Sequence, residues 1–164
     1  MSVEGIAISL ILNGTTREAV VRPDERLVDL LRDTLGHKGT KIGCETGHCG
    51  ACTVLLDGAA VCSCLVLAPE CDGRELVTVE GIAGPEGLNP VQSALGESTA
   101  IQCGYCTPGF LIAATALLEE NPSPSEDEIR AALVGNLCRC TGYESYVRAV
   151  MAASRAGRRV RTHA

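Results

Sequence analysis

Residues 43–53 read GCETGHCGACT, and the rest of the chain has to fold so that it supports this cysteine-rich loop. It places three cysteines in the spacing C-x4-C-x2-C: Cys44, Cys49 and Cys52. Three thiolates from one short loop converge on a compact centre only if the backbone bends tightly. The glycines at 43, 47 and 50 allow such bends and let backbone N–H groups approach sulfur. The loop therefore predicts a metal site with thiolate ligands.

The same spacing is that of plant-type ferredoxins, in which a fourth cysteine further along the chain completes the ligands of a [2Fe-2S] cluster. Cys62 and Cys64 follow the turn at Asp57-Gly58 on a predicted strand, and two residues apart on one strand point to the same face. Cys71 is a third candidate. The pattern leaves the choice among these three open.

A second group of cysteines lies in the C-terminal half, as Cys103-x2-Cys106 and Cys138-x-Cys140. Each pair precedes a predicted helix start, at Pro108 and at Thr141, where free N–H groups and the helix dipole favour thiolate charge. The two pairs predict a four-thiolate site. Their spacing is compatible with zinc as well as with an iron–sulfur cluster.

The composition favours metal over disulfides. The chain has 164 residues, ten of them cysteine, with 46% apolar and 21% charged residues. Ile6 to Leu12, the longest apolar run near the start, is too short for a membrane span and unlike a signal peptide. We therefore expect a cytoplasmic protein, and thiols in a reducing compartment indicate metal binding.

Charge and aromatic content argue against nucleic acid as a partner. The net charge is −6, and the four arginines among the last ten residues carry +4, so residues 1–154 carry −10. One Phe, three Tyr and no Trp leave little surface for stacking bases. We expect the basic tail, residues 158–164, to be disordered.

The first half of the chain has the pattern of strands and turns. Asn13-Gly14 predicts a hairpin between 6–12 and 15–21, and Asp57-Gly58 predicts a second one between 53–56 and 59–61. A segment that starts at Pro23-Asp24 has leucines at helical spacing and ends at Gly36, so it predicts one amphipathic helix. A further strand is expected over 75–79. Strands with one packed helix indicate an α+β fold.

The second half has the pattern of four short helices, which predict a small helical bundle. Asn89-Pro90 and Thr107-Pro108 are helix starts, and Ser125-x-x-Glu128 and Thr141-x-x-Glu144 are capping boxes. Residues 81–90 are rich in turn formers and predict a linker. The expected organisation is a domain over 1–80, the linker over 81–90 and a helical domain over 91–157.

No motif for substrate chemistry accompanies the cysteines. The histidines at 37, 48 and 163 do not pair with cysteines as Rieske ligands do, so His48 is interpreted as a loop residue. No phosphate loop, dinucleotide fingerprint or triad signature occurs in the sequence. We expect a chain that transforms no substrate itself.

Three stretches together resemble one family: GCETGHCGACTV (43–54), QCGYCTPG (102–109) and GNLCRCTGY (135–143). They are similar to the small iron–sulfur subunit of the xanthine oxidase family of molybdenum hydroxylases, which includes bacterial CO dehydrogenase. The resemblance extends from about residue 4 to residue 155. It implies an N-terminal plant-type ferredoxin-like β-grasp domain followed by a C-terminal four-helix bundle domain.

The resemblance also implies the ligands of two [2Fe-2S] clusters. The family's Val-x-Ser-Cys strand corresponds to Val61-Cys62-Ser63-Cys64, which makes Cys64 the fourth ligand of the first cluster and leaves Cys62 and Cys71 spare. The second cluster takes Cys103, Cys106, Cys138 and Cys140. Gln102 matches a residue that hydrogen-bonds the pterin.

The implied activity is electron transfer within a larger enzyme. A large subunit carries molybdopterin, in the cytosine dinucleotide form, and a medium subunit carries FAD. Electrons pass singly from molybdenum through the helical-domain cluster and then the β-grasp cluster to FAD. The implied assembly is a dimer of heterotrimers. Whether the holoenzyme acts on CO, a purine, an aldehyde or an N-heteroaromatic compound is left open.

Overall fold

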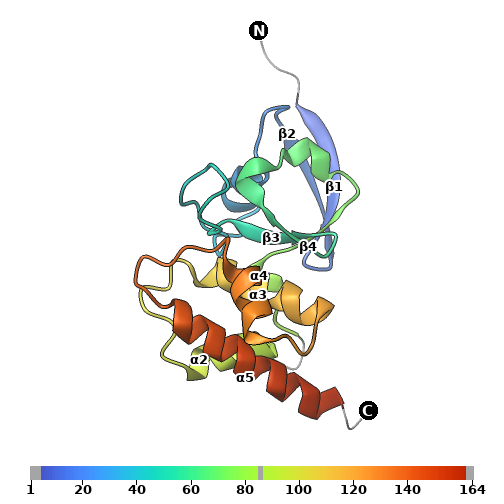
Figure 1. Ribbon diagram of the computed structural model, residues 1–164. Helices are drawn as coiled ribbons and strands as arrows, with labels where there is room; N and C mark the ends of the chain where they lie inside the picture. The colour runs from blue at the N-terminus through green and yellow to red at the C-terminus, as the bar shows by residue number, and fades with distance from the viewer. Residues whose placement is uncertain (1–4, 85–86, 162–164) are drawn as a thin grey trace.

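The chain folds into a sheet-containing N-terminal part and a helical C-terminal part, which lie against each other (Figure 1). The computed structural model describes residues 5–84 and 87–161. Helix α3 (Thr107–Glu120) packs on strands β3 (Thr53–Leu56) and β4 (Ala59–Cys62), so the helical part meets the sheet at the edge that these two strands form. The arrangement confirms the α+β class.

The N-terminal part is a mixed five-stranded sheet in the order β2-β1-β5-β3-β4. Strands β1 (Ile6–Leu12) and β2 (Thr15–Val21) form the predicted hairpin, in which Leu12 pairs with Thr15. Strands β3 and β4 form the second hairpin, in which Leu56 pairs with Ala59. Strand β5 (Glu75–Val77) runs parallel to β1 and antiparallel to β3, and is two residues shorter than predicted.

The two tight turns explain these hairpins. Asn13 and Gly14 have φ angles of 50° and 77°, and Asp57 and Gly58 have 48° and 80°. Positive φ at both central residues is the turn geometry that matches the twist of paired strands. Asn and Asp tolerate this conformation better than other residues with a Cβ atom, which is why the dipeptides predict the turns correctly.

The helix predicted to start at Pro23-Asp24 differs from the observed one. A short helix α1 covers Leu27–Asp29 and continues as the π-helix η1 over Leu30–Thr34. The residues before Leu27 are engaged elsewhere: Leu27 N–H donates to the Val66 carbonyl at 2.8 Å, and the Glu25 carbonyl accepts from Ala68 at 2.7 Å. These tertiary hydrogen bonds hold the start of the segment in an extended form.

The leucines of this segment are buried as predicted. Leu27, Leu30 and Leu31 have no exposed surface and pack with Leu10 and Leu76 of the sheet. Gly36 has a φ angle of +77°, which confirms its role at the helix end. Three 3-10 turns complete this part: η2 (Ser63–Leu65), η3 (Ala68–Cys71) and η4 (Val79–Gly81).

The C-terminal part contains the helices α2 (Pro90–Glu97), α3, α4 (Glu126–Leu133) and α5 (Tyr143–Arg161). Asn89 caps α2 and Ser125 caps α4, each through a complete capping box. Within the described residues, no helix is long and apolar enough to cross a membrane.

The capping box predicted at Thr141 is not formed. Thr141 has a φ angle of +63°, and α5 begins two residues later, at Tyr143. The Thr141 N–H donates to the Cys138 carbonyl, and the Gly142 N–H donates to the Cys138 sulfur at 3.4 Å. The backbone therefore turns around a thiol instead of adopting the N-cap conformation.

The tail is in part helical. Helix α5 continues through Arg161, so residues 158–161, which the sequence assigned to a disordered tail, belong to the helix, while 162–164 lie outside the described residues. Ala and Arg are among the best helix formers, and residues 152–161 (AASRAGRRVR) are rich in both.

Candidate metal centres

The first three cysteines lie in the loop between η1 and β3, and this loop aims several backbone N–H groups at one sulfur. The Cys44 sulfur accepts hydrogen bonds from the N–H groups of Thr46 at 3.4 Å, His48 at 3.3 Å and Cys49 at 3.3 Å. Hydrogen bonds to the charged form favour that form. The Thr46 side chain, as the largest cause, and the N–H groups of Thr46 and Cys49 lower the pKa of Cys44 to about 5. The loop is thus arranged to hold a thiolate.

Gly43 is required by a close approach rather than by an unusual backbone angle. A Cβ atom at position 43 would lie 2.6 Å from the sulfur of Cys49. Any larger residue would push that sulfur out of place. Gly50 differs, since its φ angle is +66°. The sequence analysis predicted that both glycines allow the loop to bend. At position 43, glycine is needed because the Cys49 sulfur leaves no room for a Cβ atom.

Both Cys62 and Cys64 lie beside the buried Cys52. Cys64, in η2, is 5% exposed, and Cys62 is the last residue of β4 and is half-buried. Burial raises the pKa of each of the two, and both thiols pack in one cluster with Cys52. Because β4 ends at Cys62, the prediction that both belong to one strand is wrong, although both cysteines pack beside Cys52.

The surroundings of the two candidates differ. The Cys62 thiol donates to the Gly47 carbonyl at 3.7 Å, so it ties the strand to the ligand loop. The Ser63 hydroxyl donates to the Cys52 carbonyl at 2.7 Å and fixes the turn that carries Cys64.

Cys71 lies in the hydrophobic core of the sheet part. It has no exposed surface and packs with residues such as Leu27, Val54 and Leu76. Its thiol donates to the Leu67 carbonyl at 3.8 Å, and burial raises its pKa to about 11. A thiol in this environment stays protonated and acts as a small apolar side chain.

The second set of cysteines comes from two loops that meet at the starts of α3 and α5. The Cys103 thiol lies beside that of Cys140, and the Cys106 thiol lies beside that of Cys138, close enough for each neighbour to shift the pKa. The Tyr105 N–H, the largest cause, and Cys140 lower the pKa of Cys103, whereas burial raises the pKa of Cys106. Cys103 is exposed and Cys138 is buried, so the set extends from the surface inward.

Two tyrosines support this second set, and sequence reasoning missed both. The Tyr146 hydroxyl lies 2.8 Å from the Thr107 hydroxyl and 3.6 Å from the Cys106 sulfur. Tyr143 Oη accepts from the Cys138 N–H at 2.9 Å. The sequence does contain a sign of this role. Tyr143 and Tyr146 follow Cys140 closely and are three residues apart, a spacing that brings both to one side of a helix.

The donor set fits two-iron clusters. Within residues 5–84 and 87–161, no three His, Cys, Asp or Glu side chains converge closely enough to hold a single metal ion. Thiols instead approach each other in pairs, as Cys52 with Cys64 and Cys103 with Cys140. A [2Fe-2S] core takes four thiolates, two at each iron, so paired thiols with N–H donors nearby match its needs.

Gln102 and His48 are both exposed loop residues. Gln102 lies just before Cys103, in the loop between α2 and α3. The His48 N–H donates to the Cys44 sulfur, while its ring lies 3.2 Å from the Thr46 hydroxyl. The histidine thus contributes its backbone to the first set.

The two sets lie on loops that contact each other directly, which the sequence could not indicate. The Leu137 N–H donates to the Cys49 carbonyl at 2.9 Å, and the Asn136 amide donates to the Gly50 carbonyl at 3.0 Å. The Tyr105 hydroxyl donates to the Ile42 carbonyl at 2.6 Å. These contacts join segments that are far apart in the chain.

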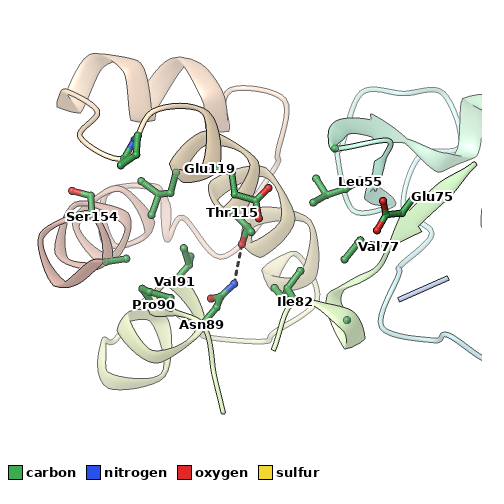
Figure 2. Close-up of a pocket in the computed structure, with 15 residues that line it drawn as sticks. Leu55, Glu75, Val77, Ile82, Asn89, Pro90, Val91, Thr115, Glu119 and Ser154 are labelled. Carbon is green, nitrogen blue, oxygen red and sulfur yellow. Dashed lines mark hydrogen bonds between the residues drawn. The ribbon is translucent and has the colours of Figure 1, made fainter. Parts of the chain in front are cut away.

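A cavity of about 600 Å³ lies elsewhere, between the sheet and the helices (Figure 2). Leu55 and Val77 line it from the sheet side and Val91 from α2, while Asn89 donates to Thr115 Oγ1 at 3.2 Å. No cysteine is among its lining residues, so the thiol chemistry lies outside this cavity.

Comparison with known families gives two matches that together cover most of the chain. Residues 10–80 match a 2Fe-2S iron-sulfur cluster binding domain, and residues 78–151 match a [2Fe-2S] binding domain. Each match contains one of the two sets of thiols. The matches account for both sets.

Individual relatives are similar over nearly their full length. The nicotine 6-hydroxylase small subunit of Paenarthrobacter nicotinovorans is 51% identical over 89% of this chain and 88% of its own length. The nicotinate dehydrogenase small FeS subunit of Eubacterium barkeri is 48% identical, over 84% of this chain and 88% of its own. In quinoline 2-oxidoreductase from Pseudomonas putida 86, one chain superposes with a TM-score of 0.90 at 47% identity, covering 95% of this chain and 98% of that one.

Proposed function

The chain belongs to the small iron–sulfur subunits of the molybdenum hydroxylases, the family of xanthine dehydrogenase, and we propose that it transfers electrons between the cofactors of its partner subunits. It carries two [2Fe-2S] clusters and is one subunit of a multi-subunit molybdenum-dependent oxidoreductase. Substrate chemistry belongs to other chains of that enzyme.

One observation carries this proposal: the two sets of thiols lie on loops that hydrogen-bond each other, and each set has a side open to solvent. Cys103 is exposed in the second set, and His48 is exposed beside the first. When bound, a [2Fe-2S] cluster accepts and releases one electron at a time. A chain with two adjacent sets and two open sides suits transfer between two different partners.

The proposed ligands of the first cluster are Cys44, Cys49, Cys52 and Cys64, and those of the second are Cys103, Cys106, Cys138 and Cys140. Paired thiols and N–H donors to sulfur support both sets. Cys62 lies beside the first set and is proposed as a spare thiol, as is the buried Cys71.

We further propose two domains: a ferredoxin-like β-grasp domain over 1–80 and a four-helix bundle domain over 91–157, joined by a linker over 81–90. The separate cores support this division. One cluster of buried residues extends from Ile8 to Leu76, and the other from Val91 to Ala153, with no residue in common.

The proposed partners are a large subunit with molybdopterin, in its cytosine dinucleotide form, and a medium subunit with FAD, assembled as a dimer of heterotrimers in the cytoplasm. Electrons then enter at the second set and leave from the first. The exposed position of Gln102 beside Cys103 supports a contact between its amide and the pterin.

The substrate is decided by another chain. The relatives belong to enzymes named for nicotine, nicotinate and quinoline, although their iron–sulfur chains are 47–51% identical to this one. We therefore assign the selectivity among those compounds to the other subunits. The sequence of the large subunit would identify the substrate class.

Metal analysis of the protein, expressed in iron-replete cells, tests the proposal. We expect a red-brown protein with about four irons and four inorganic sulfides per chain, and with reduced clusters visible by electron paramagnetic resonance. A colourless protein that contains zinc would identify a structural assembly module instead. Flavin- and molybdenum-containing chains should co-purify in equal amounts, whereas a stand-alone ferredoxin would purify without them.

A further inference from the structure

Three hydrogen bonds join the loops that carry the two sets of thiols, and each connects residues that are proposed ligands or lie within two positions of one. The donors are the Tyr105 hydroxyl, the Asn136 amide and the Leu137 N–H. Tyr105 precedes Cys106, and Leu137 precedes Cys138. The acceptors are carbonyls of Ile42, Gly50 and Cys49, in the first ligand loop. The seam between the sets is therefore built from the ligand segments themselves.

Asn136 is the buried member of this seam. It is 5% exposed, and its amide donates to the Gly50 carbonyl at 3.0 Å. Its own N–H donates to the Leu133 carbonyl at the end of α4, which fixes the residue in place. A buried amide with a defined partner costs free energy if it loses that partner, so the contact restrains both loops.

Two glycines make this close approach possible. A Cβ atom at Gly50 would lie 2.4 Å from the Gly135 carbonyl, and one at Gly109 would lie 2.2 Å from the Gly50 carbonyl. The backbones of three segments thus meet closely, with the Asn136 amide packed against both glycines. The seam therefore depends on close backbone packing at these glycines as well as on its hydrogen bonds.

The seam also provides a short connection between the two sets. The Cys49 carbonyl accepts from the Leu137 N–H at 2.9 Å, and Leu137 is covalently joined to Cys138. A proposed ligand of one cluster is therefore one hydrogen bond and one residue away from a proposed ligand of the other. Loosening the seam lengthens this connection.

We propose that Asn136 and Tyr105 are positioning residues that hold the two cluster sites at a fixed separation, and that they thereby set the rate at which one electron passes from one cluster to the other. This inference rests on the proposed function, because it requires both clusters to be present. Neither residue is assigned to bind iron.

The test compares the Asn136→Ala and Tyr105→Phe variants with the unchanged protein in the assembled enzyme. Asn121→Ala is the matched control, since the amide of this asparagine also donates a hydrogen bond, to Glu128, but lies at the far end of α3. Iron and sulfide are measured first. The readouts are the magnetic coupling between the two reduced clusters, the rate of electron equilibration between them after flash reduction, and hydrogen exchange of the peptide that contains Leu137.

In Asn136→Ala with full iron content, we expect weaker and broader magnetic coupling and slower equilibration than in Asn121→Ala. The loss of a hydrogen bond worth about 1 kcal/mol should speed exchange of the Leu137 amide roughly fivefold. Tyr105→Phe, which removes only a hydroxyl from a half-exposed ring, should produce the same changes to a smaller extent.

Unchanged coupling and equilibration in both variants, with full cluster content, would overturn the proposal and leave the electron-transfer function intact. If Asn136→Ala loses a cluster, Tyr105→Phe decides: altered coupling supports the proposal and unaltered coupling refutes it. If the protein without any substitution contains no iron, that result would instead contradict the proposed function itself.

Discussion

Replacing Gly50 by alanine should destabilise the protein far more than the same change at Gly14. Both glycines have φ angles in the left-handed region, +66° at Gly50 and +77° at Gly14. A residue with a Cβ atom pays roughly 1–2 kcal/mol in that conformation, so this term is common to both variants. The surroundings separate them, because a Cβ atom at Gly50 would meet the Gly135 carbonyl at 2.4 Å while nothing lies within 4 Å of one at Gly14.

The clash with the Gly135 carbonyl adds a second free-energy cost, which applies to Gly50→Ala but not to Gly14→Ala. Inserting a methyl group into a well-packed contact costs about 1–3 kcal/mol, which gives a total loss of roughly 2–5 kcal/mol. For a chain of this size, 1 kcal/mol corresponds to about 2–4 °C in the melting temperature. We therefore expect Gly50→Ala to lower the melting temperature by roughly 4–20 °C and Gly14→Ala by roughly 2–8 °C.

The assay is thermal unfolding of the two variants and the unchanged protein, followed by far-ultraviolet circular dichroism and by the visible absorbance of the clusters. In Gly50→Ala, both signals should be lost at a lower temperature, since Gly50 follows the proposed ligand Cys49 and is itself part of the seam. Equal losses in the two alanine variants would refute the reasoning, because they would mean that the contact with Gly135 carries no free energy.

Further predictions follow from other sites. Cys62→Ser should keep both clusters, whereas Cys64→Ser should lower the iron content from about four to about two per chain; the reverse result would exchange their assignments. The Ser125 N–H lowers the pKa of Glu128, so this carboxylate should stabilise α4 above its unfolded pKa and lose that effect as the pH falls through its lower folded pKa. Glu128→Gln should therefore flatten the acid side of the stability profile, as measured by denaturation at several pH values. Gln102→Ala should leave iron content and melting temperature unchanged and weaken association with the molybdopterin subunit, as measured by co-purification.

Short-range features of the fold could be predicted from the sequence. The turns at Asn13-Gly14 and Asp57-Gly58 and the capping box at Ser125 involve residues at most three apart, so the residues that decide them are adjacent in the chain. The errors have a shared cause. The start of α1 is held by Val66, and the turn at Thr141 is held by the Cys138 sulfur, so other hydrogen bonds override local preference.

Metal binding by thiolates could be predicted from the sequence, because the spacing within each cysteine group decides which thiols one loop can bring together. The sequence left open which of the later cysteines joins the first loop. The structure narrows this choice by placing Cys71 in the sheet core, and it brings both Cys62 and Cys64 beside Cys52.

The relation between the two sites is a property of the tertiary structure alone. The Asn136 amide and its acceptor at Gly50 are 86 residues apart, and neither residue type by itself indicates the other. The packing of α3 on β3 brings these loops together. At this contact, Gly50 and Gly109 leave room for the close approach, and the buried Asn136 amide holds the loops. Ligand spacing is local and is readable from the chain, whereas the separation between two clusters depends on how the sheet and the helices pack.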